Sequence, residues 1–121
     1  MKHLIAFVAA TDLRRARAFY EGMLGLRIIG EEPFALVLDV DGTMLRVSRV
    51  EKVSIAPYTV LGWTVDDINA AIDDLTQRDV VFERFERFPQ DERGVWTAGD
   101  GTRVAWFRDP DGNLLSLTQF R

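Results

Sequence analysis

Hydrophobic and polar positions follow two periods along the chain, and these predict strands together with two helices. Short apolar or alternating runs are typical of strands, and they cover residues 4–9, 26–29, 34–40, 43–50, 58–65, 80–82, 95–98, 102–108 and 113–120. Apolar residues recur every three or four positions in residues 13–24 and 68–75, which predicts one helix in each segment. Gly25 is placed to end the first helix.

The predicted elements occur twice in the same order, a strand and a helix followed by three strands, with one additional short run in the second copy. Residues 8–13 resemble residues 63–68, and residues 38–45 resemble residues 108–115. Two matches in the same order, on matching elements, indicate a duplicated module. The second copy is the longer one because it contains the charged segment 83–94, which is predicted to be a loop.

The start of that loop leaves three interpretations open. Residues 83–88 alternate charged side chains with phenylalanine. This pattern fits an edge strand that runs into a loop, and it also fits a mobile flap or a contact between two copies of the chain.

Composition narrows the functions that the chain can have. Its 121 residues are 47% hydrophobic and 28% charged, which is typical of one globular domain. The absence of cysteine excludes disulfides, zinc–thiolate sites and thiol catalysis, and there is a single histidine, His3. A net charge of −4 argues against nucleic acid as a partner. No apolar run is long enough to cross a membrane, and no signal peptide is recognisable, so we expect a cytoplasmic location.

Two motifs resemble the vicinal oxygen chelate superfamily, which includes glyoxalase I, extradiol dioxygenases and the fosfomycin- and bleomycin-resistance proteins. They are AFYEGMLGL at residues 18–26 and FRDPDGN at residues 107–113. The resemblance implies an α+β fold in which tandem βαβββ modules form a curled eight-stranded mixed sheet around a cup, with the helices outside. It implies one domain over residues 1–121, with modules at about 1–52 and 56–121, and a homodimer.

The resemblance also implies four positions at which metal-using members hold their ion. Counting from the motifs places them here at Ile5, Arg46, Val60 and Ser116. Two aliphatic side chains have no donor atoms, a guanidinium repels a divalent cation, and a lone serine is a poor ligand. We therefore predict that neither the metal nor any other cofactor is retained.

Strand alternation predicts which other side chains line the cup. Phe7, Tyr58 and Thr118 share a face with the four positions, and Trp106 joins them from the strand before the second motif. Such a mixed face of apolar walls and few polar groups is typical of small-molecule pockets. Tyr58 and Phe7 would form walls, although plain packing fits them equally well.

Four of these side chains each have a functional and a structural interpretation. Arg46 could anchor a carboxylate, phosphate or phenolate, or it could reach solvent or pair with a nearby Asp or Glu. Trp106 could stack on a planar ligand, or pack in the core or in a dimer interface. Ser116 and Thr118 could donate hydrogen bonds to a ligand, or bond to water and backbone.

The sequence therefore favours a metal-free protein that binds a small molecule, resembling the bleomycin-resistance branch. The expected ligand is partly aromatic and carries an anionic group. One alternative is a glyoxalase- or dioxygenase-like lyase, isomerase or oxygenase. Another is a metal-independent enzyme that uses Arg46 to stabilise charge, with His3 or Tyr58 as acid or base. No residue is assigned a catalytic role.

Overall fold

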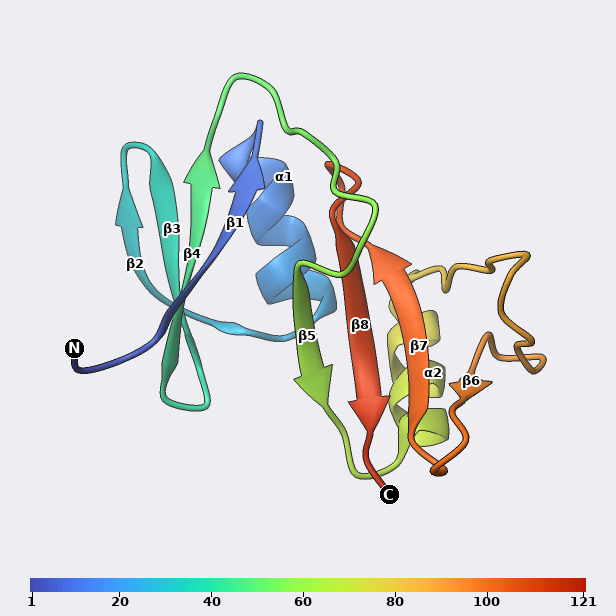
Figure 1. Cartoon of the computed structure of the whole chain (residues 1–121). Coiled ribbons are helices and arrows are strands. Elements are labelled where there is room, and N and C mark those ends of the chain that lie inside the picture. Colours follow the sequence, from blue (N-terminus) through green and yellow to red (C-terminus); the bar gives the residue numbers. More distant parts are fainter. The chain divides into compact units, whose positions relative to one another are not determined.

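A computed structural model describes all 121 residues, and it contains the two predicted helices and eight strands (Figure 1). Its elements are β1 (Ile5–Ala10), α1 (Leu13–Arg17), the π-helical η1 (Ala18–Met23), β2 (Arg27–Glu32), β3 (Ala35–Val40), β4 (Thr43–Arg49), β5 (Leu61–Thr64), α2 (Ile68–Gln77), β6 (Trp96–Thr97), β7 (Arg103–Arg108) and β8 (Leu114–Gln119). The chain divides into two compact units, Met1–Ile55 with Asp109–Asn113, and Ala56–Arg108 with Leu114–Arg121.

Each unit contains one four-stranded mixed sheet, so the α+β fold and the duplication are confirmed. The strand order is β1-β4-β3-β2 in the first sheet and β5-β8-β7-β6 in the second. The eight strands are thus hydrogen-bonded as two sheets of four and do not form one continuous sheet. In both sheets the first strand of the module runs parallel to the last strand, while the other pairs are antiparallel.

The strand register reproduces the sequence repeat. Ala6 lies opposite Leu45 in the first sheet, and Leu61 lies opposite Leu115 in the second. These are the partners that the alignment of the two modules requires, because a slip of one residue would turn every side chain to the other face.

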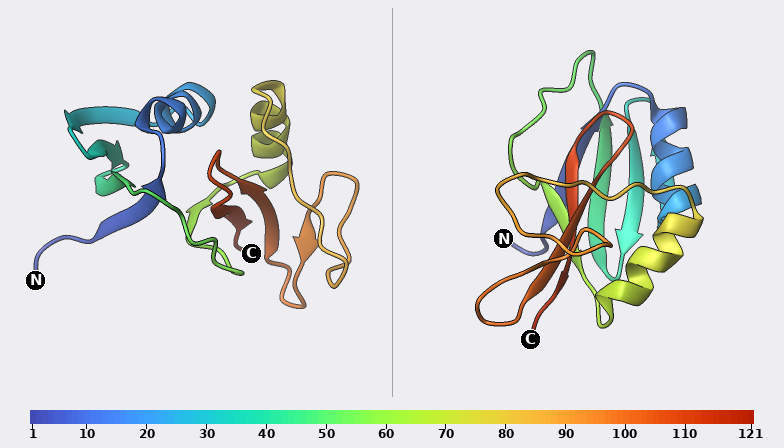
Figure 2. Two further views of the ribbon diagram at one scale, coloured as in Figure 1. Left: turned by 90° about the horizontal axis from the view of Figure 1, so that it is seen from above. Right: turned by 90° about the vertical axis from the view of Figure 1, so that its right-hand side faces the viewer.

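One helix covers one face of each sheet (Figure 2). The Asp12 carboxylate accepts hydrogen bonds from the backbone N–H groups of Arg14 and Arg15, which starts α1, and the Asp67 carboxylate caps α2 in the same way. The helix-facing side chains of the strands are buried in both units, as the alternation predicts. They are Val8, Ala10, Leu36, Leu38, Leu45 and Val47 in the first unit, and Ala105, Phe107, Leu115 and Leu117 in the second.

The predicted first helix has the right extent, but its second half is wound as a π-helix. The segment η1 follows α1 without interruption and ends before Gly25, whose φ of 72° lies in the left-handed region that favours glycine. Phe19 and Tyr20 are both buried in this segment and meet edge to face, with ring centroids 5.0 Å apart.

The two motifs that suggested the family contact each other. The Tyr20 hydroxyl donates a 2.6 Å hydrogen bond to Oδ2 of Asp109, which also accepts from the Asn113 side chain. Oδ1 of Asp109 accepts from the backbone N–H groups of Asp111 and Asn113. Burial and the adjacent Asp109 carboxylate raise the pKa of Tyr20, so its proton stays in place to make this bond.

Three predicted strands are shorter in the structure. Residues 80–82 contribute only a bridge between Phe82 and Phe107, and the strand expected at 95–98 reduces to β6. The strand expected from residue 58 begins at Leu61, after the segment that contains Pro57. Neither helix has the length and apolar character needed to cross a lipid bilayer.

Candidate functional site

Arg46 lies on the face of the first sheet that points away from the helix, and it has an acidic partner. Its guanidinium donates to both carboxylate oxygens of Glu32 at the end of β2, at 2.6 Å and 3.2 Å. The hydrogen bond from Arg46 holds the pKa of Glu32 below its usual range, and the same bond raises the pKa of Arg46. The structure therefore matches the interpretation in which Arg46 pairs with a nearby acid.

The donor set at the four implied metal positions does not fit a divalent cation. Ile5 and Arg46 lie on the first sheet, and Val60 and Ser116 belong to the second unit. No group of three or more His, Cys, Asp or Glu side chains occurs anywhere in the structure that could hold a metal ion. Ile5 and Phe7 are exposed beside Arg46, at 43% and 61% of their maximal surface.

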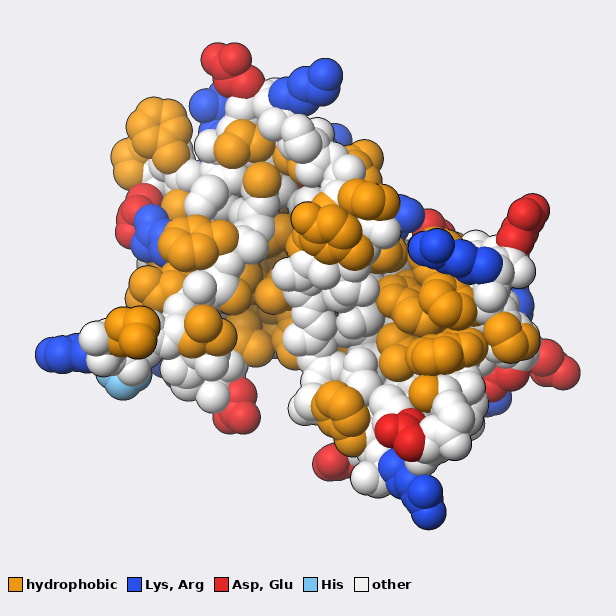
Figure 3. All heavy atoms as spheres, in the orientation of Figure 1, with side chains coloured by type: hydrophobic (Ala, Val, Ile, Leu, Met, Phe, Trp, Pro, Cys, Tyr) orange, Lys and Arg blue, Asp and Glu red, His pale blue; other side chains and the backbone are white.

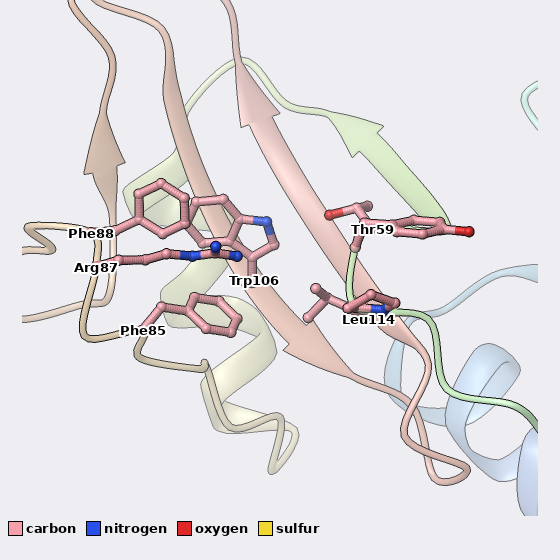
Figure 4. A pocket seen from close by; sticks show the side chains of 8 residues that line it. Thr59, Phe85, Arg87, Phe88, Trp106 and Leu114 are labelled. Carbon is pink, nitrogen blue, oxygen red and sulfur yellow. The ribbon is translucent and has the colours of Figure 1, made fainter.

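The second unit contains a pocket of about 220 Å³ on the side of its sheet away from α2 (Figure 4). Four parts of the chain form it: the residues before β5, the strand β7, the strand β8 and the loop that follows α2. The lining residues are Pro57, Tyr58, Thr59, Phe85, Arg87, Phe88, Trp106 and Leu114. The pocket is open to solvent, and its walls are mostly aromatic and aliphatic.

An aromatic cluster forms one wall of the pocket. Phe88 stacks on Trp106 with centroids 5.3 Å apart and the rings inclined by 15°, and Phe85 meets Trp106 edge-on at 5.5 Å. Trp96 completes the cluster, 5.3 Å from Phe88 and 6.3 Å from Trp106. Figure 3 shows hydrophobic side chains gathered over β7 in the second unit, with a basic side chain at their edge. Trp106 thus both packs against its neighbours and lines the pocket.

Arg87 is the charged residue of this pocket, and it has no carboxylate partner in the structure. Its guanidinium carbon lies 5.6 Å from the centroid of the Phe88 ring, which is a cation–π contact. In the view of Figure 4 its side chain extends between Phe85 and Phe88 toward Trp106. The other lining residues carry no charge, so no carboxylate lines the pocket beside Arg87.

The loop that holds these side chains is anchored at its base by Gln90. The Gln90 amide donates to the carbonyls of Glu83 and Gly94 at 3.0 Å and 2.7 Å, and its oxygen accepts from the N–H of Phe85 at 2.7 Å. The Arg84 guanidinium adds hydrogen bonds to two further loop carbonyls. Side-chain hydrogen bonds from Gln90 and Arg84 thus hold together the two ends of the loop that contains residues 85–88.

The structure brings only some of the predicted site residues together. Tyr58 and Trp106 line the pocket, and Ser116 and Thr118 lie on the same face of β8. Sequence reasoning missed the lining residues Phe85, Arg87, Phe88, Pro57 and Thr59 as ligand contacts. The alternation of charge and phenylalanine in residues 83–88 was the available signal, but it did not reveal where the loop packs.

A duplicated βαβββ unit with a pocket on the sheet face away from the helix defines a small α+β protein of paired modules. The chain belongs to the Glyoxalase/Bleomycin resistance protein/Dioxygenase superfamily, whose family model matches residues 1–117. This confirms the family that the two motifs indicated. The superfamily includes lyases and dioxygenases as well as resistance proteins.

Individual relatives agree with this assignment. The uncharacterized protein YraH of Bacillus subtilis (strain 168) is 31% identical over 132 residues, with 97% of each chain covered. A glyoxalase/bleomycin resistance protein/dioxygenase from Alicyclobacillus acidocaldarius has a TM-score of 0.74 at 22% identity, covering 98% of this chain and 91% of that one. A lactoylglutathione lyase from Agrobacterium tumefaciens has a TM-score of 0.67 at 22% identity, with 96% and 91% covered. These structural likenesses show the fold.

Proposed function

We propose that the chain binds a small aromatic anion in the pocket of the second unit. The observation that supports this is an arginine without an acidic partner, Arg87, in a pocket whose other lining residues are uncharged. Aromatic walls favour a planar ligand through offset or edge-to-face ring contacts. A guanidinium makes charge-assisted hydrogen bonds to carboxylates, which fix the orientation of the ligand.

In this proposal the residue that binds the anion is Arg87, whereas the sequence had suggested Arg46. Arg46 already has both carboxylate oxygens of Glu32 as acceptors, and a ligand would have to displace that partner. Arg87 needs no such exchange, since its contact is with the face of an aromatic ring. A metal-dependent lyase or oxygenase has less support, because the four implied positions lack the necessary donors.

The proposal is tested by displacing the fluorescent anion 8-anilinonaphthalene-1-sulfonate with benzoates that carry one further group, including 4-ethylbenzoate and 4-acetylbenzoate. We expect saturable binding by the wild-type chain. An Arg87→Gln variant should bind the benzoates roughly 10- to 100-fold more weakly, because a hydrogen bond to a charged group contributes roughly 1.5–3 kcal/mol.

Arg27→Gln is the matched control. Arg27 lies in the first unit, is exposed and makes no ion pair, so the variant removes the same charge away from the pocket. It should bind like the wild type, and so should Arg46→Gln. An absence of saturable binding, or an equal loss in the Arg87 and Arg27 variants, would contradict the proposal.

A further inference from the structure

The sheet face next to the pocket contains a notch that a glycine leaves open. Gly62 on β5 lies directly opposite Ser116 on β8. A Cβ atom added to Gly62 would lie 2.7 Å from Oγ of Ser116 and 3.2 Å from its carbonyl oxygen. Any larger residue at Gly62 would therefore have to displace the Ser116 side chain.

Ser116 is a buried residue, 7% exposed, whose hydroxyl has no hydrogen-bond partner within the chain. No fully buried polar side-chain atom of the protein lacks a hydrogen-bond partner, so the Ser116 oxygen must retain access to solvent. The missing side chain at Gly62 explains this access, because it leaves space directly over the hydroxyl.

The notch shares its face of the sheet with the pocket. Ser116 is the cross-strand partner of Trp106 on β7, so their side chains lie on one face. Leu114 precedes Ser116 by two positions on β8 and therefore points the same way. Trp106 and Leu114 both line the pocket, which makes the Ser116 hydroxyl the nearest polar group along that wall of β8.

The first unit has no such notch at the equivalent place. There the partners in the matching register are Phe7 on β1 and Arg46 on β4. A bulky ring thus replaces the glycine, and a cation paired with Glu32 replaces the hydroxyl. The notch is a feature of one module, as expected for a site that was adapted after the duplication.

We infer that Gly62 and Ser116 form a subsite that selects ligands carrying a carbonyl group. The Ser116 hydroxyl donates a hydrogen bond to the carbonyl oxygen, and Gly62 determines specificity by keeping the hydroxyl accessible. This inference rests on the proposed function, because the ring of the same ligand lies against Trp106 and its carboxylate meets Arg87. A ligand that displaces water from the Ser116 hydroxyl without offering a hydrogen-bond acceptor leaves that hydroxyl unpaired, which costs binding free energy. The subsite therefore disfavours ligands that have no acceptor next to Ser116.

The test compares 4-acetylbenzoate with 4-ethylbenzoate, which share ring and carboxylate and differ in the carbonyl oxygen. We expect the wild type to bind the acetyl compound about fivefold to tenfold more tightly. Ser116→Ala should remove this preference while retaining 4-ethylbenzoate affinity. Gly62→Ala should weaken the binding of 4-acetylbenzoate, because the added methyl group crowds the Ser116 hydroxyl. Gly99→Ala adds the same methyl group where no atom lies within 4 Å and should leave both affinities unchanged.

The outcomes separate the two proposals. A wild type that binds both benzoates equally, or a Ser116→Ala variant that keeps the preference, overturns the subsite while the anion pocket stands on its Arg87 dependence. A wild type that binds neither compound overturns both. Because Ser116→Ala removes one atom and adds none, it decides the question even if Gly62→Ala fails to fold.

Discussion

The two sheets share one topology and one register, yet their faces away from the helices differ. In the first sheet that face has an arginine paired with Glu32 and an exposed Phe7. In the second it has an aromatic wall, an arginine without a carboxylate partner and a hydroxyl beneath a glycine. The helix-facing sides remain alike, with Leu45 and Leu115 both buried at equivalent positions. The duplicated scaffold has thus kept its core while its outer faces diverged.

The largest expected effect on stability concerns the turns before the last strand of each module. Asp109 is buried and accepts hydrogen bonds from Tyr20, Asn113 and Asp111. Its counterpart in the sequence repeat, Asp39, accepts from the N–H of Gly42 at an exposed turn. We expect Asp109→Ala to lower the free energy of unfolding by roughly 3–5 kcal/mol, since each orphaned buried donor costs about 1–3 kcal/mol.

Asp39→Ala should cost less than about 1 kcal/mol, because water replaces the lost acceptor. Urea denaturation of both variants measures the difference. Similar losses in the two variants would mean that the buried cluster around Asp109 is not what makes its turn distinctive.

The cores should respond alike where the outer faces do not. Leu45→Ala and Leu115→Ala each remove a fully buried side chain from the layer between sheet and helix. Each should lower the free energy of unfolding by about 3 kcal/mol, from lost burial plus the cavity left behind. Paired thermal and urea unfolding experiments would show whether the modules are equivalent here; a loss confined to one variant would contradict equal packing.

The smallest effect concerns the ion pair that distinguishes the first sheet. Arg46 lowers the pKa of Glu32 in the folded chain below its ordinary value of 4.5. The pair therefore stabilises the fold above that value, and the contribution is lost as the pH falls through the lowered pKa. Glu32→Gln should have a lower urea midpoint than the wild type at neutral pH, and the two should converge in strong acid.

Glu51→Gln serves as the control for that comparison, because Glu51 is exposed and makes no ion pair. Its urea midpoint should follow the wild type at every pH. A gap between Glu32→Gln and the wild type that persists in strong acid would show that the effect does not arise from the charge of Glu32.

The sequence predicted the fold well because its signals are local and repeated. Alternation placed Leu45, Phe107 and Leu115 on the helix side, and the register agrees with the repeat. The contact of Tyr20 with Asp109 was not predictable, since both motifs read locally as a helix end and a turn. Side-chain pairing across long separations has no periodic signature.

The candidate site was predicted only in part, for the same reason. Tyr58 and Trp106 were found because they lie on or beside strands whose alternation fixes their direction. Arg87 and Phe88 lie on a loop without periodicity, so their packing on Trp106 depends on tertiary contacts. Whether Arg46 anchors a ligand or forms an ion pair depended on whether the second strand extends as far as Glu32. The strand pattern predicted that strand only over residues 26–29, so it did not place Glu32 beside Arg46.

The Gln90 anchor has a consequence for how the binding surface can change. One side-chain amide closes the base of the loop through the backbone of residues 83, 85 and 94, and none of these bonds involves the side chains of residues 86–88. Glu86 and Arg87, which also lie outside the aromatic cluster around Trp106, can therefore be exchanged while the loop keeps its closure. New ligand preferences could evolve, or be selected from a library, without refolding the protein beneath them.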